Sequence, residues 1–82
     1  MKVYVVFREY LNWAETNGAE IVGVFKELEK AEEKIKKVYE EELMFLQQEE
    51  YKIVTEEKGR HYIEISTAYG DVNIYITTKE VE

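Results

Sequence analysis

The sequence predicts an α+β domain in which one long helix packs on one face of a mostly antiparallel sheet of about five strands. A helical repeat of apolar residues runs through the middle of the chain. Segments rich in β-branched and aromatic residues lie on both sides of this repeat, and glycine marks turns between them. The predicted order of elements is therefore ββαβββ, within a single domain of residues 1–82.

The first strand is predicted at residues 2–10 and the second at residues 20–25, with a connection at residues 11–18. Val5 and Phe7 fall on one face of the first strand, and Tyr4 and Val6 fall on the other. A strand that is apolar on both faces is typical of the centre of a sheet, so we expect both faces to be at least partly covered.

The helix is predicted at residues 28–48. The apolar residues that recur there at helical spacing are Leu28, Ala31, Ile35, Val38, Tyr39, Leu43 and Leu46. Such a helix is roughly 30 Å long, which is close to the length of a strand of about nine residues. One helix can therefore lie along the whole sheet.

The last third of the chain predicts three more strands, at residues 51–56, 60–69 and 72–79. Gly70-Asp71 reads as a two-residue hairpin turn, which pairs Ile65 with Ile76. This register makes one face of the hairpin apolar and the other mostly polar, as expected when only one face is buried.

The turn before this hairpin predicts a different loop length. A three-residue loop at residues 57–59 sets Ile53 opposite Ile63 and keeps the apolar residues on one face. Gly59 then takes the left-handed position of the loop.

Few residues are suited to catalysis. The chain has no cysteine, and His61 and Ser66 are its only histidine and serine. These counts exclude a thiolate or histidine-pair metal site, and no glycine-rich phosphate loop is present. The 18 acidic residues make carboxylate pairs common, so no pair is singled out. We therefore predict no catalytic residue, no cofactor, no metal ligand and no enzyme activity.

The formal net charge is −7, from 18 acidic and 11 basic residues. This excess repels nucleic acid and favours a protein partner with a basic surface. The first residues lack the apolar length of a signal peptide, and no segment has the roughly 20 apolar residues of a membrane span. We therefore expect a cytoplasmic protein that binds neither nucleic acid directly nor a membrane.

The predicted partner-binding residues are Glu40, Glu41, Glu42, Glu49, Glu50, Trp13, Tyr62 and Tyr75. The carboxylates gather late in the helix, where the macrodipole disfavours them. Tyr62 and Tyr75 fall on the sheet face away from the helix, and exposed Tyr and Trp are common interface anchors. These residues predict a protein-binding surface whose carboxylates imitate phosphate groups.

Three alternatives remain open. The acidic residues also fit a solvated helix end or the charged surface of a thermophilic protein. The chain also fits a homodimeric or accessory domain, joined through the open sheet face or through Met44 and Phe45. A small-ligand sensor, with a pocket between the sheet and residues 11–18, is the third.

Three segments resemble a class of small uncharacterised phage and bacterial domains. They read KVYVV at residues 2–6, IVGVF at residues 21–25 and LEKAEE at residues 28–33. The class shows a short strand, a loop, an IxGVF strand and a helix that starts near EKAE, and the resemblance covers about half of the chain. It implies no site residue. By analogy it implies a phage-type inhibitor, similar to anti-CRISPR proteins, that occupies a basic nucleic-acid-binding surface of a host protein.

Overall fold

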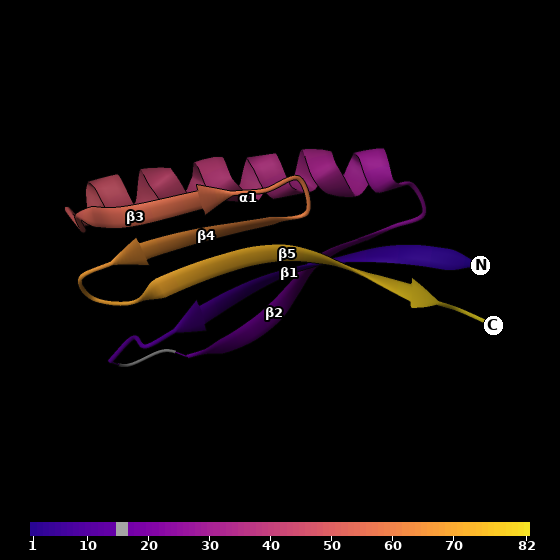
Figure 1. The fold of residues 1–82 in the computed structure, drawn as a ribbon, viewed down its shortest axis with the longest axis horizontal. Helices are drawn as coiled ribbons and strands as arrows, with labels where there is room; N and C mark the ends of the chain where they lie inside the picture. The colour runs from indigo at the N-terminus through magenta and orange to yellow at the C-terminus, as the bar shows by residue number, and fades with distance from the viewer. Residues whose placement is uncertain (15–16) are drawn as a thin grey trace.

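Five antiparallel strands form one sheet, and a single helix packs on it, in the computed structural model of residues 1–14 and 17–82 (Figure 1). The elements are β1 (Lys2–Leu11), β2 (Gly18–Phe25), α1 (Leu28–Gln48), β3 (Ile53–Lys58), β4 (Tyr62–Thr67) and β5 (Asp71–Glu80). The strands lie side by side in the order β2-β1-β5-β4-β3, so the last strand of the chain occupies the middle of the sheet. The predicted α+β class and the predicted order of elements are confirmed.

The core lies between α1 and one face of the sheet. The helix turns one stripe of buried side chains toward the sheet: Ala31, Ile35, Val38, Glu42 and Leu46. The sheet meets this stripe with Val6, Ile63, Ile65, Val72 and Ile74. Burying an aliphatic side chain of this size contributes about 1.5–3 kcal/mol, so the contact between these two layers supplies most of the hydrophobic stabilisation.

α1 begins and ends at the predicted residues. Its buried stripe differs from the predicted one because Glu42 is buried, whereas Leu43 is only half-buried. The described part of the chain contains no helix that is long and apolar enough to cross a membrane.

β1 lies between β2 and β5, as expected for an inner strand. Val6 faces the helix and is fully buried. On the other face, Val5 is buried and Phe7 is half-buried, although no described helix or strand lies over them. Phe7 is covered within the sheet by Tyr75, whose ring stacks on it with a centroid distance of 5.2 Å. Both faces of β1 are therefore partly covered, but the far face is covered by its own sheet.

The predicted register of the β4–β5 hairpin is wrong. Ile65 pairs with Val72 instead of Ile76, so the loop spans residues 67–70. The hydroxyl of Thr67 closes this loop, because its oxygen accepts hydrogen bonds from two loop amides and donates one to the carbonyl of Gly70. The partner of Ile65 moves by four residues, an even number, so every side chain keeps its predicted face.

The predicted loop between β3 and β4 is also wrong. Ile53 pairs with Thr67 instead of Ile63, after a bulge next to Thr55. Gly59 does not take a left-handed conformation, which among the described glycines only Gly18 adopts. A Cβ atom at Gly59 would lie 2.8 Å from the ring of Tyr62. A side chain at this position would therefore have to displace the ring of Tyr62.

The new register turns two charged residues of β3 toward the helix layer. Glu56 accepts a 2.5 Å hydrogen bond from the hydroxyl of Tyr39. The ammonium of Lys58 lies 4.5 Å from the centre of the same ring. The edge strand β3 is thus held to α1 by polar contacts with one tyrosine.

The C-terminus of α1 closes with a Schellman motif. The amide of Tyr51 donates to the carbonyl of Leu46, and the amide of Glu50 donates to that of Gln47. The motif places Glu50 in the left-handed region, with φ at 59°. This position favours glycine, because a side chain there costs about 1–2 kcal/mol.

Substituting Glu50→Gly should raise the free energy of unfolding by about 1 kcal/mol, since relief of the strained backbone outweighs the added flexibility of the unfolded chain. Glu49→Gly is the matched control, because it removes the same charge from the adjacent residue, whose φ of −85° is ordinary. It should lower stability by about 0.5–1 kcal/mol. Urea unfolding measures both values, and equal effects of the two substitutions would contradict the role of Glu50.

Candidate functional site

The structure places the predicted partner-binding residues in separate regions. Glu40 and Glu41 are exposed on α1, and Glu49 and Glu50 are exposed where α1 ends. Tyr62 and Tyr75 lie on the face of the sheet that α1 does not cover, and they are direct cross-strand partners in β4 and β5. The structure therefore does not bring the predicted residues together into one surface.

Trp13 is half-buried and packs within the molecule. Its indole nitrogen donates a 2.9 Å hydrogen bond to the carbonyl of Asp71. Its ring lies against Gly70, where an added Cβ atom would come within 2.5 Å of it. This residue closes the end of the β4–β5 hairpin. The predicted connection at residues 11–18, and the ligand pocket considered beside it, include residues 15 and 16, which lie outside the described residues.

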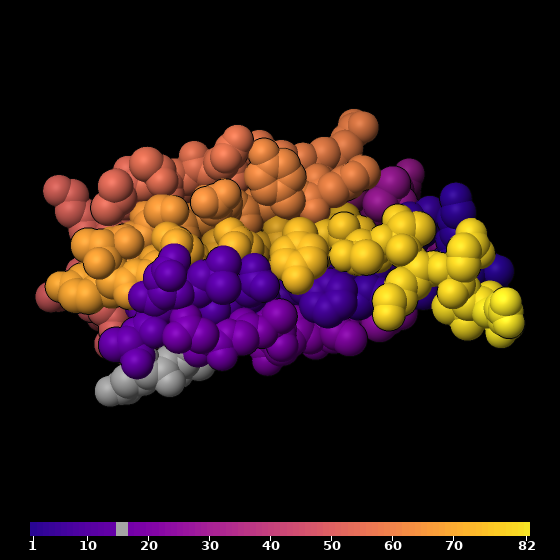
Figure 2. Space-filling model, turned by 60° about the horizontal axis from the view of Figure 1, so that its bottom comes forward, coloured from indigo at the N-terminus to yellow at the C-terminus, as the bar shows by residue number. Residues whose placement is uncertain are grey.

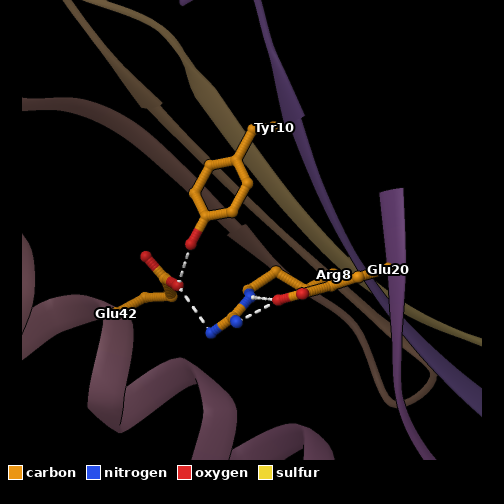
Figure 3. Close-up of polar contacts among 4 residues, drawn as sticks. All are labelled: Arg8, Tyr10, Glu20 and Glu42. Carbon is orange, nitrogen blue, oxygen red and sulfur yellow. Dashed lines mark hydrogen bonds and ion pairs between the residues drawn. The ribbon is translucent and has the colours of Figure 1, made fainter. Parts of the chain in front are cut away.

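Glu42 is the clear correction, because it is 3% exposed and belongs to no acidic surface. Its Oε1 atom accepts hydrogen bonds from Arg8 at 3.0 Å and from the hydroxyl of Tyr10 at 2.5 Å (Figure 3). Glu42 follows Val38 by four residues and precedes Leu46 by four, so helix geometry places it in the core stripe. This spacing was the available signal, together with the inward-facing position of Arg8 on β1.

Arg8 joins three elements. It lies on β1, it reaches Glu42 on α1, and it forms two hydrogen bonds to Glu20 on β2, one of them from Nε at 2.9 Å (Figure 3). Glu20 is its cross-strand partner in the sheet. One guanidinium therefore serves two carboxylates, and the group of four residues with Tyr10 carries a formal charge of −1.

The environment of this group shifts two pKa values. Burial raises the pKa of Tyr10, and its hydrogen bond to Glu42 raises it further. For Arg8, burial alone would lower the pKa, but the hydrogen bond with Glu20 and the surrounding negative charge outweigh burial and raise it. Arg8 therefore keeps its charge and Tyr10 keeps its proton.

This group, of which Glu42 is the buried member, has the features of a structural anchor. Its tyrosine holds its proton, its arginine is held by two carboxylates, and Glu42 Oε2 is buried without a hydrogen-bond partner among the described residues. The other two candidates for chemistry, His61 and Ser66, lie far from each other. The imidazole of His61 is 4.0 Å from the carboxylate of Glu32. Ser66 lies near the far end of β4, about 16 Å from His61 along an extended strand.

No described group of three or more histidine, aspartate or glutamate side chains is arranged to hold a metal ion. An open groove of about 570 Å³ lies between α1 and the β3–β4 turn. Oppositely charged side chains line this groove, and Arg60 is paired with Glu32 across 3.5 Å.

An apolar row crosses the uncovered face of the sheet. It consists of cross-strand neighbours on β2, β1, β5 and β4, namely Ile21, Phe7, Tyr75 and Tyr62. Ile21 is 59% exposed and Tyr62 is 45% exposed. Figure 2 shows this side of the molecule, with the four strands side by side.

An acidic row lies next to the apolar row on the same face. It consists of Glu9, Glu64 and Glu57, with Asn73 between the first two in the strand register. The hydroxyl of Tyr62 donates to Glu57 at 3.1 Å, which links the two rows. Sequence reasoning found Tyr62 and Tyr75 on this face. It did not predict the two rows, because the residues of β1 and β2 reach those of β4 only through the pairing of β1 with β5.

Comparison with models of protein families, with curated proteins and with solved structures gave no match.

Exchanging Arg8→Met should destabilise the domain by about 3–5 kcal/mol, because Glu42 would stay buried without its cation. Glu42→Leu should change stability far less, since Arg8 keeps Glu20 as a partner and leucine suits the core. The double variant should therefore be more stable than Arg8→Met alone. Urea unfolding of the three variants checks this cycle, and strictly additive effects would show that Arg8 and Glu42 do not interact.

The raised pKa of Tyr10 predicts a loss of stability at alkaline pH. Above the ordinary tyrosine pKa of about 10, the unfolded chain releases a proton that folded Tyr10 retains, so the free energy of unfolding falls as pH rises. Tyr10→Phe should cost about 1–3 kcal/mol at neutral pH, and the gap to the wild type should narrow above pH of about 10. Unfolding curves across this range test it, and a constant gap would contradict it.

Proposed function

We propose that this chain is a protein-binding domain without catalytic activity, and that it binds a basic protein surface through the sheet face that α1 leaves uncovered. The observation that carries the proposal is the pair of adjacent rows on this face. The apolar row crosses four strands, and the acidic row runs beside it.

The apolar row is suited to anchor a protein partner. Aromatic residues, and tyrosine in particular, carry much of the binding energy in protein interfaces. Phe7 and Tyr75 hold each other in a stacked arrangement with an interplanar angle of 15°. Tyr62 and Ile21 flank this stack and are more exposed. A partner would therefore meet a preformed apolar centre with a more accessible residue at each end.

The acidic row specifies the charge of the partner. Three carboxylates border the apolar row on one side, on a molecule whose net charge is −7. An interface with an apolar centre and lysine or arginine at its border complements this arrangement, and such complementarity speeds association. In this proposal the acidic row takes the place of the predicted acidic surface on the late helix, from which the burial of Glu42 removes a central member.

The narrower form of the proposal is a phage-type inhibitor that occupies a basic nucleic-acid-binding surface. In this form the carboxylates that stand in for phosphate groups are those of the acidic row. His61 directly precedes β4 and Ser66 lies near its far end, so the two side chains cannot form the hydrogen-bonded pair that a serine nucleophile and its base require, which supports a function without such catalysis.

To test the proposal, the immobilised chain is exposed to a lysate of its source cells, and a captured protein is identified by mass spectrometry, purified and titrated. Tyr62→Ala should weaken its binding at least about tenfold, as expected for an interface anchor. Tyr69→Ala is the matched control. Tyr69 is also exposed, at 61%, but it lies in the β4–β5 turn beside Tyr51, outside the apolar row.

Charge reversal tests the acidic row in the same titration. Glu64→Lys should slow association and reduce its salt dependence, whereas Glu41→Lys, the same change at an exposed residue of α1, should have little effect. The opposite pattern, with Glu41→Lys impaired and both Glu64→Lys and Tyr62→Ala unchanged, would place binding on the helix and contradict the proposal.

A further inference from the structure

The two edges of the sheet differ in how they are protected. β2 and β3 are the edge strands, and each leaves one side of its backbone without a strand partner among the described residues. Unpaired N–H and C=O groups on an edge strand can pair with another strand, so natural proteins protect such edges with charges, bulges or short strands.

β3 carries all three kinds of protection. It has six residues, three of which are the charged Glu56, Glu57 and Lys58. A bulge interrupts its pairing between Ile53 and Thr55. Its exposed apolar residue, Val54, lies at this bulge and is 64% exposed. A second strand cannot follow this edge over any length without meeting a charge or an irregular backbone.

β2 carries much less protection. It has eight residues, and Glu20 is its single charged side chain. That carboxylate is turned toward β1, where it accepts both hydrogen bonds from Arg8. Ile21 and Val24 are 59% and 56% exposed. One bulge interrupts the pairing with β1 next to Val6, and residues 18–21 keep a regular register on one side of it.

We propose that β2 pairs in antiparallel fashion with β2 of a second copy of this chain, which makes one continuous sheet across two molecules. A two-fold contact uses the same surface of both copies, so that surface must complement itself. β2 is compatible with this condition, because Glu20, its one charged residue, forms an ion pair with Arg8 of its own chain.

The pairing also extends the uncovered face. The apolar row ends at Ile21 on β2, so two copies joined at this edge bring the ends of their rows together. The exposed side chain of Ile21 then gains cover from the second copy. A contact along one strand buries less than the roughly 1,200 Å² of stable interfaces, so the dimer is expected to be weak and concentration-dependent.

This inference stands on the edge of β2 and does not depend on the proposed function, which concerns the face of the sheet. An experiment can therefore disprove the dimer without disproving the proposed function, and the reverse also holds. A dimer through the edge leaves Tyr62 accessible, because this residue lies on β4, three strands away from β2, and Tyr75 lies on the central strand β5.

Sedimentation velocity over a series of protein concentrations tests the pairing. The wild type should show a reversible monomer–dimer equilibrium. Ile21→Lys should weaken it by about a hundredfold, because two like charges then meet at the contact. Val54→Lys is the matched control, since it places the same charge at a similarly exposed residue of the other edge strand. It should dimerise like the wild type.

Two further measurements separate the edge from the face. Tyr62→Ala should leave the equilibrium unchanged, whereas a dimer joined face to face would be weakened by it. Hydrogen exchange of the wild type should slow with concentration in residues 18–25 and not in residues 53–58, a readout that needs no variant. A wild type that stays monomeric at every concentration, or an Ile21→Lys variant that dimerises normally, would overturn the proposal.

Discussion

One helix has to cover a sheet of five strands, and it can cover only one face. α1 meets this demand by lying along the sheet, so that a single stripe of its side chains contacts inward-facing residues of β1, β4 and β5. Because side chains alternate along a strand, this contact determines which alternate residues of every strand belong to the core and which face away from it. The uncovered face and its two rows are the direct consequence of a two-layer fold.

The polar group around Arg8 is part of the same packing contact. Arg8 links β1, β2 and α1 through Glu20 and Glu42, so three elements that are separate in sequence converge on one guanidinium. Buried ion pairs add little net stability compared with well-packed apolar side chains, but a misaligned pair is costly. A helix displaced by one turn would leave Glu42 away from Arg8 and Tyr10. The group therefore penalises wrong alignments of α1 on the sheet.

The same contact leaves two regions that a partner can use. On the uncovered face, Phe7 and Tyr75 shield each other, whereas Tyr62 and Ile21 remain accessible. At the edges, β3 is short, has a bulge and carries three charged residues, whereas β2 is longer, has one bulge and carries one charged residue, which is ion-paired. These two regions bind partners in different ways, since a sheet face binds through side chains and an edge strand binds through backbone hydrogen bonds.

The sequence alone determined the features that depend on local spacing. The limits of α1 at Leu28 and Gln48 follow from a repeat of three and four residues. The faces of β4 and β5, and with them Tyr62 and Tyr75, follow from alternation, which survived an error of four residues in the register.

Only the tertiary structure decided the features that depend on distant partners. Glu42 is buried because Arg8, 34 residues earlier in the chain, supplies its counter-ion. The β4–β5 turn is closed by the hydroxyl of Thr67 and covered by Trp13, which lies far away in sequence. The apolar and acidic rows exist because β1 pairs with β5, the first strand with the last. Local spacing specifies the face of a side chain, but its neighbour across the sheet is set by which strands pair.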